Sequence, residues 1–133
     1  MIEMGCTFSE SQTAARNPDG WSPPWLRPAT NTMPHDIDFP SGCTAGYASP
    51  NNDAAADAEV NTLAHETEET TADEPGTAWY DRRGYENADK CAWTFGTTYT
   101  SGGGTANVTI GAKNFLVQQN WVNTGSGGCA LHL

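Results

Sequence analysis

The residues with the clearest chemical potential form a His-Glu-x-x-Glu pattern at His65, Glu66 and Glu69. On an α-helix of about 3.6 residues per turn, His65 and Glu69 lie one above the other, so that an imidazole and a carboxylate can reach the same metal ion. Glu66 lies roughly 100° further round the helix. A carboxylate there could act on a metal-bound water, as in the related His-Glu-x-x-His arrangement of zinc proteases. The pattern therefore predicts a metal-binding helix, with Glu66 as the candidate catalytic base.

A divalent ion needs at least one further protein ligand, and the acidic residues after this helix offer several. Asp89 and Glu86 are the best placed, and Asp73 and Asp81 are weaker candidates. One nitrogen and two oxygen ligands suit zinc, iron or manganese, with zinc as the ion that we expect, whereas calcium prefers oxygen alone. If one coordination position stays open, Glu66 could take a proton from an activated water, which would make the protein a hydrolase.

The same pattern has a simpler interpretation. A helix rich in Ala and Glu places a His and a Glu four residues apart by chance, and His65 and Glu69 would then form only an ion pair. His35 and His132 stand in no recognisable motif. No Ser, Cys or Lys lies in a typical nucleophile setting, and no glycine-rich phosphate loop precedes the helix.

The charge balance favours a cation over a polyanion as a partner. The chain has 133 residues, enough for one domain with a modest core, and it carries 16 acidic and 6 basic residues, for a net charge of -10. No Lys/Arg cluster could neutralise phosphates, so that we expect no nucleic-acid partner. Eleven of the acids fall between Asp53 and Asp89. They would attract a cation, although a solvated acidic helix face explains them as well.

Targeting signals and cysteines limit the cellular context. No apolar run of about 18 residues predicts a membrane span. Residues 1–10 lack the basic start and apolar stretch of a signal peptide. Asn107 begins a glycosylation acceptor pattern, which matters only in a secreted chain. The cysteines have no Cys-x-x-Cys spacing, which argues against a zinc ribbon and for disulfides or buried thiols; three pairings remain open among Cys6, Cys43, Cys91 and Cys129.

Proline divides the chain into two parts. Seven of the eight prolines lie at or before Pro50, and residues 1–38 show no sustained helical or strand period. We expect an irregular Pro-rich segment there. Trp21 and Trp25 could mark a ligand for a proline-reading module or anchor a loop to the domain.

Strong start signals predict the site-bearing helix over residues 53–71. An Asn or Asp within residues 51–53 is the expected cap, acids fill the first turns, and Pro75 with Gly76 marks the end. The expected apolar face has helical spacing, with His65 and Glu69 at its edge, and comprises Ala56, Val60, Leu63, Ala64 and Thr67.

The segment after the helix predicts short β-strands. Residues 86–93 form a helical turn or a loop, 92–95 a short strand, and 101–104 a flexible break. The clearest β signal is a hairpin of 107–110 and 115–122 around a turn at 111–114. We therefore expect an α+β fold, in which one long site-bearing helix packs on a small antiparallel sheet that includes a C-terminal hairpin.

Four motifs together resemble the C-terminal half of the EXORDIUM-like, phosphate-induced protein family. They are Ala64-His65-Glu66 with Glu69, Ala78-Trp79-Tyr80-Asp81, Glu86-x-Ala88-Asp89-x-Cys91, and Asn114-Phe115-Leu116-Val117-Gln118 with Trp121. The resemblance runs from roughly Phe39 to Cys129, so that residues 39–133 form the EXORDIUM-like region and 1–38 match no family pattern. The combination is much more specific than any single motif.

The resemblance implies a secreted or cell-wall protein linked to growth and to phosphate or hormone response, with no settled enzymatic activity. It supports His65, Glu66, Glu69, Glu86 and Asp89 as one zincin-like HExxE cluster, in which Glu69 replaces the second His of zincin-type metallopeptidases. Family members are much longer and begin with a signal peptide. By this comparison the chain is expected to be truncated and its domain incomplete.

Three functions follow as hypotheses. The first is an extracellular growth or stress-signalling protein with a zinc site and a cell-wall or extracellular protein partner. The second is a zinc-dependent, peptidase-like metallohydrolase with Glu66 as base. The third is a module that binds cell-wall polysaccharide through exposed aromatic residues such as Trp79, Tyr80 and Tyr85.

Overall fold

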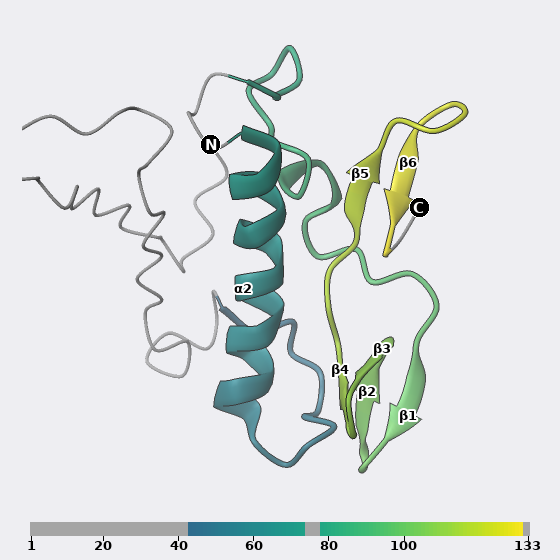
Figure 1. Ribbon diagram of the computed structural model, residues 1–133. Helices are drawn as coiled ribbons and strands as arrows, with labels where there is room; N and C mark the ends of the chain where they lie inside the picture. Colours follow the sequence, from purple (N-terminus) through teal and green to yellow (C-terminus); the bar gives the residue numbers. More distant parts are fainter. Residues whose placement is uncertain (1–42, 74–77, 132–133) are drawn as a thin grey trace, which may run out of the picture.

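The computed structural model describes residues 43–73 and 78–131. The expectations for the Pro-rich segment 1–38, including Trp21, Trp25 and His35, and for His132 lie outside the described residues. In sequence order the elements are α2 (Ala54–Asp73), the 3-10 helix η3 (Asp89–Cys91), β1 (Tyr99–Ser101), β2 (Gly104–Ala106), β3 (Val108–Ile110), β4 (Lys113–Phe115), β5 (Asn120–Val122) and β6 (Gly128–Ala130). A long helix with short antiparallel strands confirms the predicted α+β class (Figure 1).

The start of α2 follows the predicted capping chemistry. The Asp53 carboxylate accepts a hydrogen bond from the backbone N–H of Ala56 at 3.2 Å, which satisfies one of the free donors of the first turn. Ser49 Oγ in turn accepts the backbone N–H of Asp53 at 2.9 Å. The helix is described as far as Asp73, two residues beyond the predicted end.

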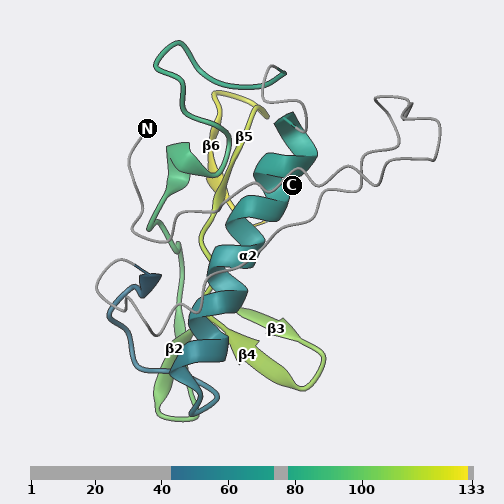
Figure 2. The same cartoon turned by 90° about the vertical axis from the view of Figure 1, so that its left-hand side faces the viewer.

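The strands form three separate two-stranded hairpins, β1–β2, β3–β4 and β5–β6, all antiparallel. All three lie along one side of α2 (Figures 1 and 2). Hairpin β5–β6 is beside the C-terminal half of the helix, and strands β1 to β4 are beside its N-terminal half. The small sheet that the sequence predicts is therefore present as three separate hairpins beside the helix.

Three local predictions were wrong. Residues 92–95 are a turn and irregular chain, because the N–H of Thr94 bonds back to the carbonyl of Cys91 at 2.9 Å. The expected break at 101–104 is the β1–β2 turn, where Gly102 and Gly103 adopt φ values of 57° and 83° that suit glycine. The predicted second strand, 115–122, is not continuous: β4 (Lys113–Phe115) begins inside the predicted turn and ends at Phe115, and only 120–122 form the separate strand β5.

The split between β4 and β5 has a clear cause. Between these strands the backbone N–H of Gln118 donates to Asn61 Oδ1 on α2 at 2.9 Å. The N–H of Val117 donates to the side chain of Asn107 at 2.8 Å. Both donors are therefore satisfied by side chains and are not available for a continuous ladder. Strand β5 then pairs with β6, a partner that the sequence did not predict.

The buried face of α2 is polar, so that the predicted apolar face was wrong. Leu63, the largest member of the predicted face, is 44% exposed. The helix instead buries side chains that stand four residues apart in one row, which we call the polar ladder: Asp57, Asn61, His65, Glu69 and Asp73.

Four of the five residues of the polar ladder each accept a hydrogen bond from a different segment outside the helix. Asp57 accepts Asn51 Nδ2 at 2.6 Å, and Asn61 accepts the N–H of Gln118 at 2.9 Å. Glu69 accepts the N–H of Asp89 at 3.1 Å, and Asp73 accepts the N–H of Ala78. The helix therefore packs against loops whose unpaired backbone donors need acceptors, which an apolar face would not provide.

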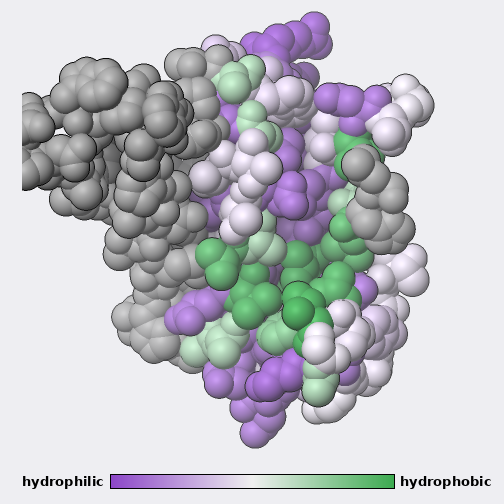
Figure 3. Space-filling view, viewed as in Figure 1, coloured by the Kyte–Doolittle hydropathy of each residue, from purple (hydrophilic) through white to green (hydrophobic). Residues whose placement is uncertain are grey.

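The apolar core of the described residues is small. Its buried members are Cys43, Ala58, Ala88, Cys91, Phe95, Ala106 and Leu116. Tyr47 packs edge-on against Phe95, with ring centroids 5.7 Å apart. In the space-filling view, hydrophobic residues gather in a band across the middle of the visible face, with mainly hydrophilic residues above it and at the lower tip (Figure 3). Among the described residues, no helix combines the length and the apolar character needed to cross a membrane.

Candidate metal centre

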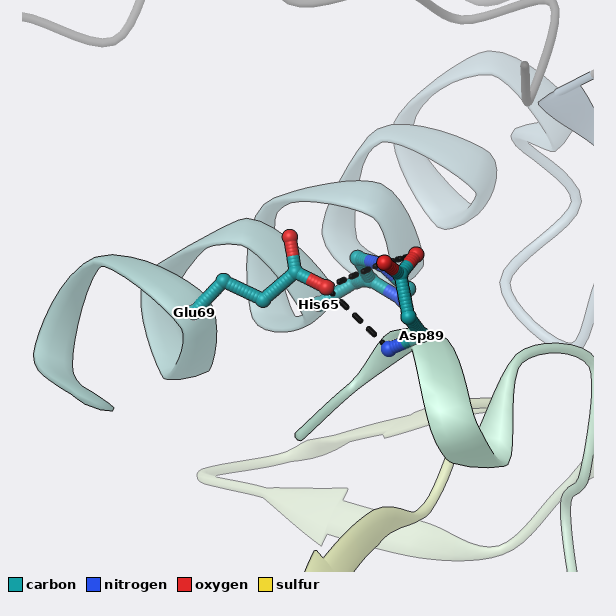
Figure 4. Close-up of side chains that lie close together, drawn as sticks. All are labelled: His65, Glu69 and Asp89. Carbon is teal, nitrogen blue, oxygen red and sulfur yellow. Dashed lines mark hydrogen bonds and ion pairs between the residues drawn. The ribbon is translucent and has the colours of Figure 1, made fainter. Parts of the chain in front are cut away.

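Three of the predicted ligands meet between α2 and η3. His65 and Glu69 extend from adjacent turns of α2, and Asp89 is the first residue of η3 (Figure 4). His65 Nε2 lies 3.0 Å from Glu69 Oε1 and 3.8 Å from Asp89 Oδ1. One ligand atom from each residue lies within 4.8 Å of the other two.

Backbone hydrogen bonds orient both carboxylates of the site. The N–H of Asp89 donates to Glu69 Oε1 at 3.1 Å. The N–H of Glu86 donates to Asp89 Oδ2 at 3.3 Å, while the other oxygen of Asp89 faces His65. Such outer contacts fix the direction in which a ligand oxygen points, and they are typical of metal sites.

The imidazole of His65 is almost fully enclosed, with 2% of the residue exposed. Nε2 faces the two carboxylates, but the described residues offer buried Nδ1 no hydrogen-bond partner. A buried polar atom without a partner is costly. The site therefore directs one ring nitrogen toward the carboxylates and leaves the other unsatisfied.

The electrostatics of the site show an excess of negative charge. Burial opposes protonation of His65, but the carboxylates of Asp89 and Glu69 beside Nε2 outweigh it and raise its pKa to about 9. Interaction with His65 lowers the pKa of Asp89. Burial, assisted by the charges of neighbouring carboxylates that include Glu69 and Asp89, raises the pKa of Glu66 and of Glu86 to about 7 each. The cluster therefore holds a proton on His65 and favours any added positive charge.

The remaining predicted residues surround this group. Glu86 contributes negative charge but is not among the three residues whose ligand atoms converge. Glu66 is half-buried and interacts electrostatically with His65 and Glu69. Of the weaker candidates, Asp73 accepts the N–H of Ala78, and Asp81 accepts the N–H groups of Arg83 and Tyr85 and pairs with Lys90 at 3.5 Å. Asp73 and Asp81 therefore stabilise loops.

The separations of the donors fit a small divalent ion. Zinc bonds of about 2.0–2.2 Å in tetrahedral geometry place ligand atoms roughly 3.3–3.6 Å apart. The two separations from His65 Nε2, 3.0 and 3.8 Å, lie on either side of that range. Calcium would need six or more oxygen ligands at longer distances. The His, Glu, Asp set therefore suits zinc or another transition metal better than calcium.

A disulfide lies next to the site. Cys91, the last residue of η3, is bonded to Cys129 of β6. Cys43 is also disulfide-bonded, and no described cysteine is a free thiol. This confirms the prediction of disulfides and chooses one pairing that the sequence left open. A disulfide is compatible with an extracellular location.

Comparison with protein families, with characterised proteins and with solved structures found no match for this chain.

Proposed function

We propose that this protein binds a divalent metal ion, with zinc as the native ion, through His65, Glu69 and Asp89. The observation that carries the proposal is the convergence of His65 Nε2 with one oxygen from each carboxylate in a space bounded by α2 and η3. Two carboxylates and a neutral imidazole balance a doubly charged cation. The surrounding acids, Glu66 and Glu86, add further attraction for it.

A matched pair of variants tests the metal site. Glu69→Gln keeps an oxygen that can accept the N–H of Asp89 but removes a charged ligand, whereas Glu68→Gln makes the same change at an exposed position on the same helix. We expect zinc to bind stoichiometrically, by elemental mass spectrometry after dialysis, in the wild type and in Glu68→Gln but not in Glu69→Gln. Circular dichroism checks the fold of each variant. Wild-type protein that is folded and takes up no zinc would exclude the proposal.

The biological role that we propose is that of an EXORDIUM-like secreted or cell-wall protein acting in growth or stress signalling. The resemblance of the motifs around His65, Asp89 and Trp121 supports it, and the disulfide between Cys91 and Cys129 agrees with an oxidising compartment. The test expresses wild type or Glu69→Gln in a deletion strain of the source organism. Rescue of the growth defect by wild type but not by Glu69→Gln would support a signalling role that needs the metal. Equal rescue by both would separate the role from the site.

A second candidate is a zinc-dependent, peptidase-like hydrolase. The observation that favours this function is that Glu66 is half-buried and interacts electrostatically with Glu69 and Asp89. Three protein ligands also leave a tetrahedral ion one position for water. Glu66 would then accept a proton from the attacking water. Cleavage of casein that is lost in Glu66→Gln, with zinc content unchanged, would establish this activity; no cleavage by zinc-loaded wild type would exclude casein-type proteolysis.

A further inference from the structure

The helix η3, which carries the ligand Asp89, is attached to the β5–β6 hairpin on both sides of that residue. Cys91, two residues after Asp89, forms the disulfide with Cys129. Asn87, two residues before it, accepts the backbone N–H of Trp121 at 2.9 Å through its carbonyl oxygen. Cys129 and Trp121 stand opposite each other in the register of β5 and β6. One pair of facing residues on the hairpin therefore holds both ends of the ligand-bearing turn.

A third contact joins the same two elements. Lys90, between Asp89 and Cys91, places its ammonium group 4.0 Å from the centre of the Trp121 ring, a cation–π contact. Lys90 also pairs with Asp81 at 3.5 Å. The indole of Trp121 is itself fixed through its N–H, which donates to Asn123 at 2.8 Å. Asp89 is thus surrounded in sequence by residues that contact the hairpin.

The other two ligands have a different support. His65 and Glu69 stand one turn apart on a helix of 20 residues, so that the helix alone fixes their relative positions. Asp89 belongs to a 3-10 helix of three residues, too short to hold its place without outside contacts. From η3 to this part of α2, Asp89 donates its N–H to Glu69 and faces His65 at 3.8 Å, and both of these partners are themselves ligands. The position of Asp89 therefore depends on the hairpin.

We propose that the Cys91–Cys129 disulfide and Trp121 are positioning residues for Asp89, so that the metal centre is complete only while the β5–β6 hairpin is fastened to η3. The inference rests on the proposed metal site. It predicts that opening the disulfide weakens metal binding. It also predicts that a bound metal slows reduction of the disulfide, because Cys91 is 1% exposed and a reductant reaches the bond only when η3 moves.

A double-mutant cycle distinguishes this role from a general contribution to stability. Zinc affinity is measured by competition with a chromogenic chelator for the wild type, Asp89→Asn, Cys91→Ala/Cys129→Ala and the triple variant. We expect Asp89→Asn to weaken zinc binding by more than about 100-fold and the disulfide variant by about 10- to 100-fold, the range for groups that support a ligand. In the variant without the disulfide, adding Asp89→Asn should weaken zinc binding by less than about threefold further.

Two results would overturn the proposal. If the loss of zinc affinity in the triple variant equals the product of the losses in Asp89→Asn and in the disulfide variant, the disulfide does not act through Asp89. Unchanged zinc affinity in the disulfide variant would mean that η3 holds Asp89 without it. The control Asn107→Ala removes hydrogen bonds that join other loops, and it should lower stability without changing zinc affinity. If wild-type protein binds no zinc, the metal site fails first and the positioning proposal with it.

The reciprocal experiment uses the native chain and does not depend on whether the disulfide variant folds. The rate of reduction of the Cys91–Cys129 bond is followed by thiol alkylation and peptide mass spectrometry, with and without zinc. We expect zinc to slow the reduction severalfold in the wild type and not in Asp89→Asn, which controls for capture of zinc by the reductant or by freed thiols. Equal rates with and without zinc in the wild type would contradict the coupling.

Discussion

His65 Nε2 faces two carboxylates that can hold either a proton or a metal ion, and this competition governs the chemistry of the site. The carboxylates of Asp89 and Glu69 stabilise the imidazolium even though burial opposes it. The metal-binding form of His is the neutral imidazole. Uptake of zinc near neutral pH therefore displaces a proton from His65, and the same pair of carboxylates stabilises both states.

The first prediction concerns the stability of the metal-free protein. The folded-state pKa values of Glu66 and Glu86, about 7, lie above the ordinary value of 4.5, so that stability is lost as pH rises from about 4.5 through 7. The pKa of His65 is raised from 6.5 to about 9, so that His65 adds a second loss of stability between these two pH values. The lowered pKa of Asp89 gives the opposite trend only in acid, below its ordinary 3.8.

The midpoint temperature of thermal unfolding of chelator-treated protein should therefore fall by several degrees from about pH 5 to pH 9. The variant His65→Asn should lack the contribution of His65 to this loss, so that the fall from about pH 7 to pH 9 should be smaller than in the wild type. Saturating zinc should abolish most of the trend, because the cation replaces the proton as the positive charge of the cluster. A midpoint that rises from pH 5 to pH 9 in the metal-free wild type would contradict the proposed electrostatics of the site.

The second prediction concerns Asn107, the residue that matches the glycosylation pattern. Its amide group donates to the carbonyls of Phe95 and Val117 at 2.8 and 2.7 Å and accepts the N–H of Val117 at 2.8 Å. A glycan replaces one of the two hydrogens of Nδ2, so that at least one of the two donated bonds would be lost. We expect Asn107 to remain unmodified in a glycosylating host, by intact-protein mass spectrometry, and Asn107→Ala to lower the free energy of unfolding by about 2–3 kcal/mol, since each lost bond contributes about 1. A glycan on folded protein would refute this.

At the scale of the elements, the polar ladder of α2 explains which parts of the fold the sequence could predict. The extent of the helix was predictable, because its cap at Asp53 is local chemistry. Its buried face was not, because Asn61 and Glu69 are buried to satisfy the N–H groups of Gln118 and Asp89, and these belong to distant segments. Helical periodicity of apolar residues carries no information about such partners.

The candidate site divides in the same way. Spacing alone placed His65 and Glu69 on one helix face, and the acidic run after the helix indicated Asp89. The sequence did not separate Asp89 from Glu86, because only the turn of η3 decides which of these carboxylates faces His65. Nor could it pair Cys91 with Cys129, since that contact requires β6 to pair with β5.

The third prediction belongs to the β5–β6 hairpin and its disulfide. The Cys91–Cys129 bond closes a loop with a sequence separation of 38. In the loop-entropy model such a cross-link contributes about 4 kcal/mol. The variant Cys91→Ala/Cys129→Ala should lose about that much stability in denaturant titration without metal. Loss of less than about 1 kcal/mol would show that strand pairing and the Lys90–Trp121 contact hold the hairpin without help.

On the scale of the whole molecule, the fold combines a small apolar core with a concentrated negative charge. The net charge is -10, and eleven acids lie between Asp53 and Asp89, the segment that forms α2 and the turn of η3. Their repulsion destabilises the compact state, and a bound divalent cation relieves it. Metal binding and folding are therefore coupled through the charge of the molecule as well as through the three ligands.

The fourth prediction follows from that charge. Charges beyond the three ligands attract the metal through solvent, and salt screens this attraction: the Debye length falls from about 30 Å at 0.01 M salt to about 3 Å at 1 M. We therefore expect zinc affinity, measured by chelator competition in potassium chloride, to fall severalfold over this range. Glu68→Lys reverses one exposed charge on α2 without touching a ligand. It should weaken binding at low salt and match the wild type at high salt. An affinity that does not change with salt would mean that the ligands alone attract the ion, and a deficit of Glu68→Lys that persists at 1 M would mean that Glu68 acts by contact and not through the field.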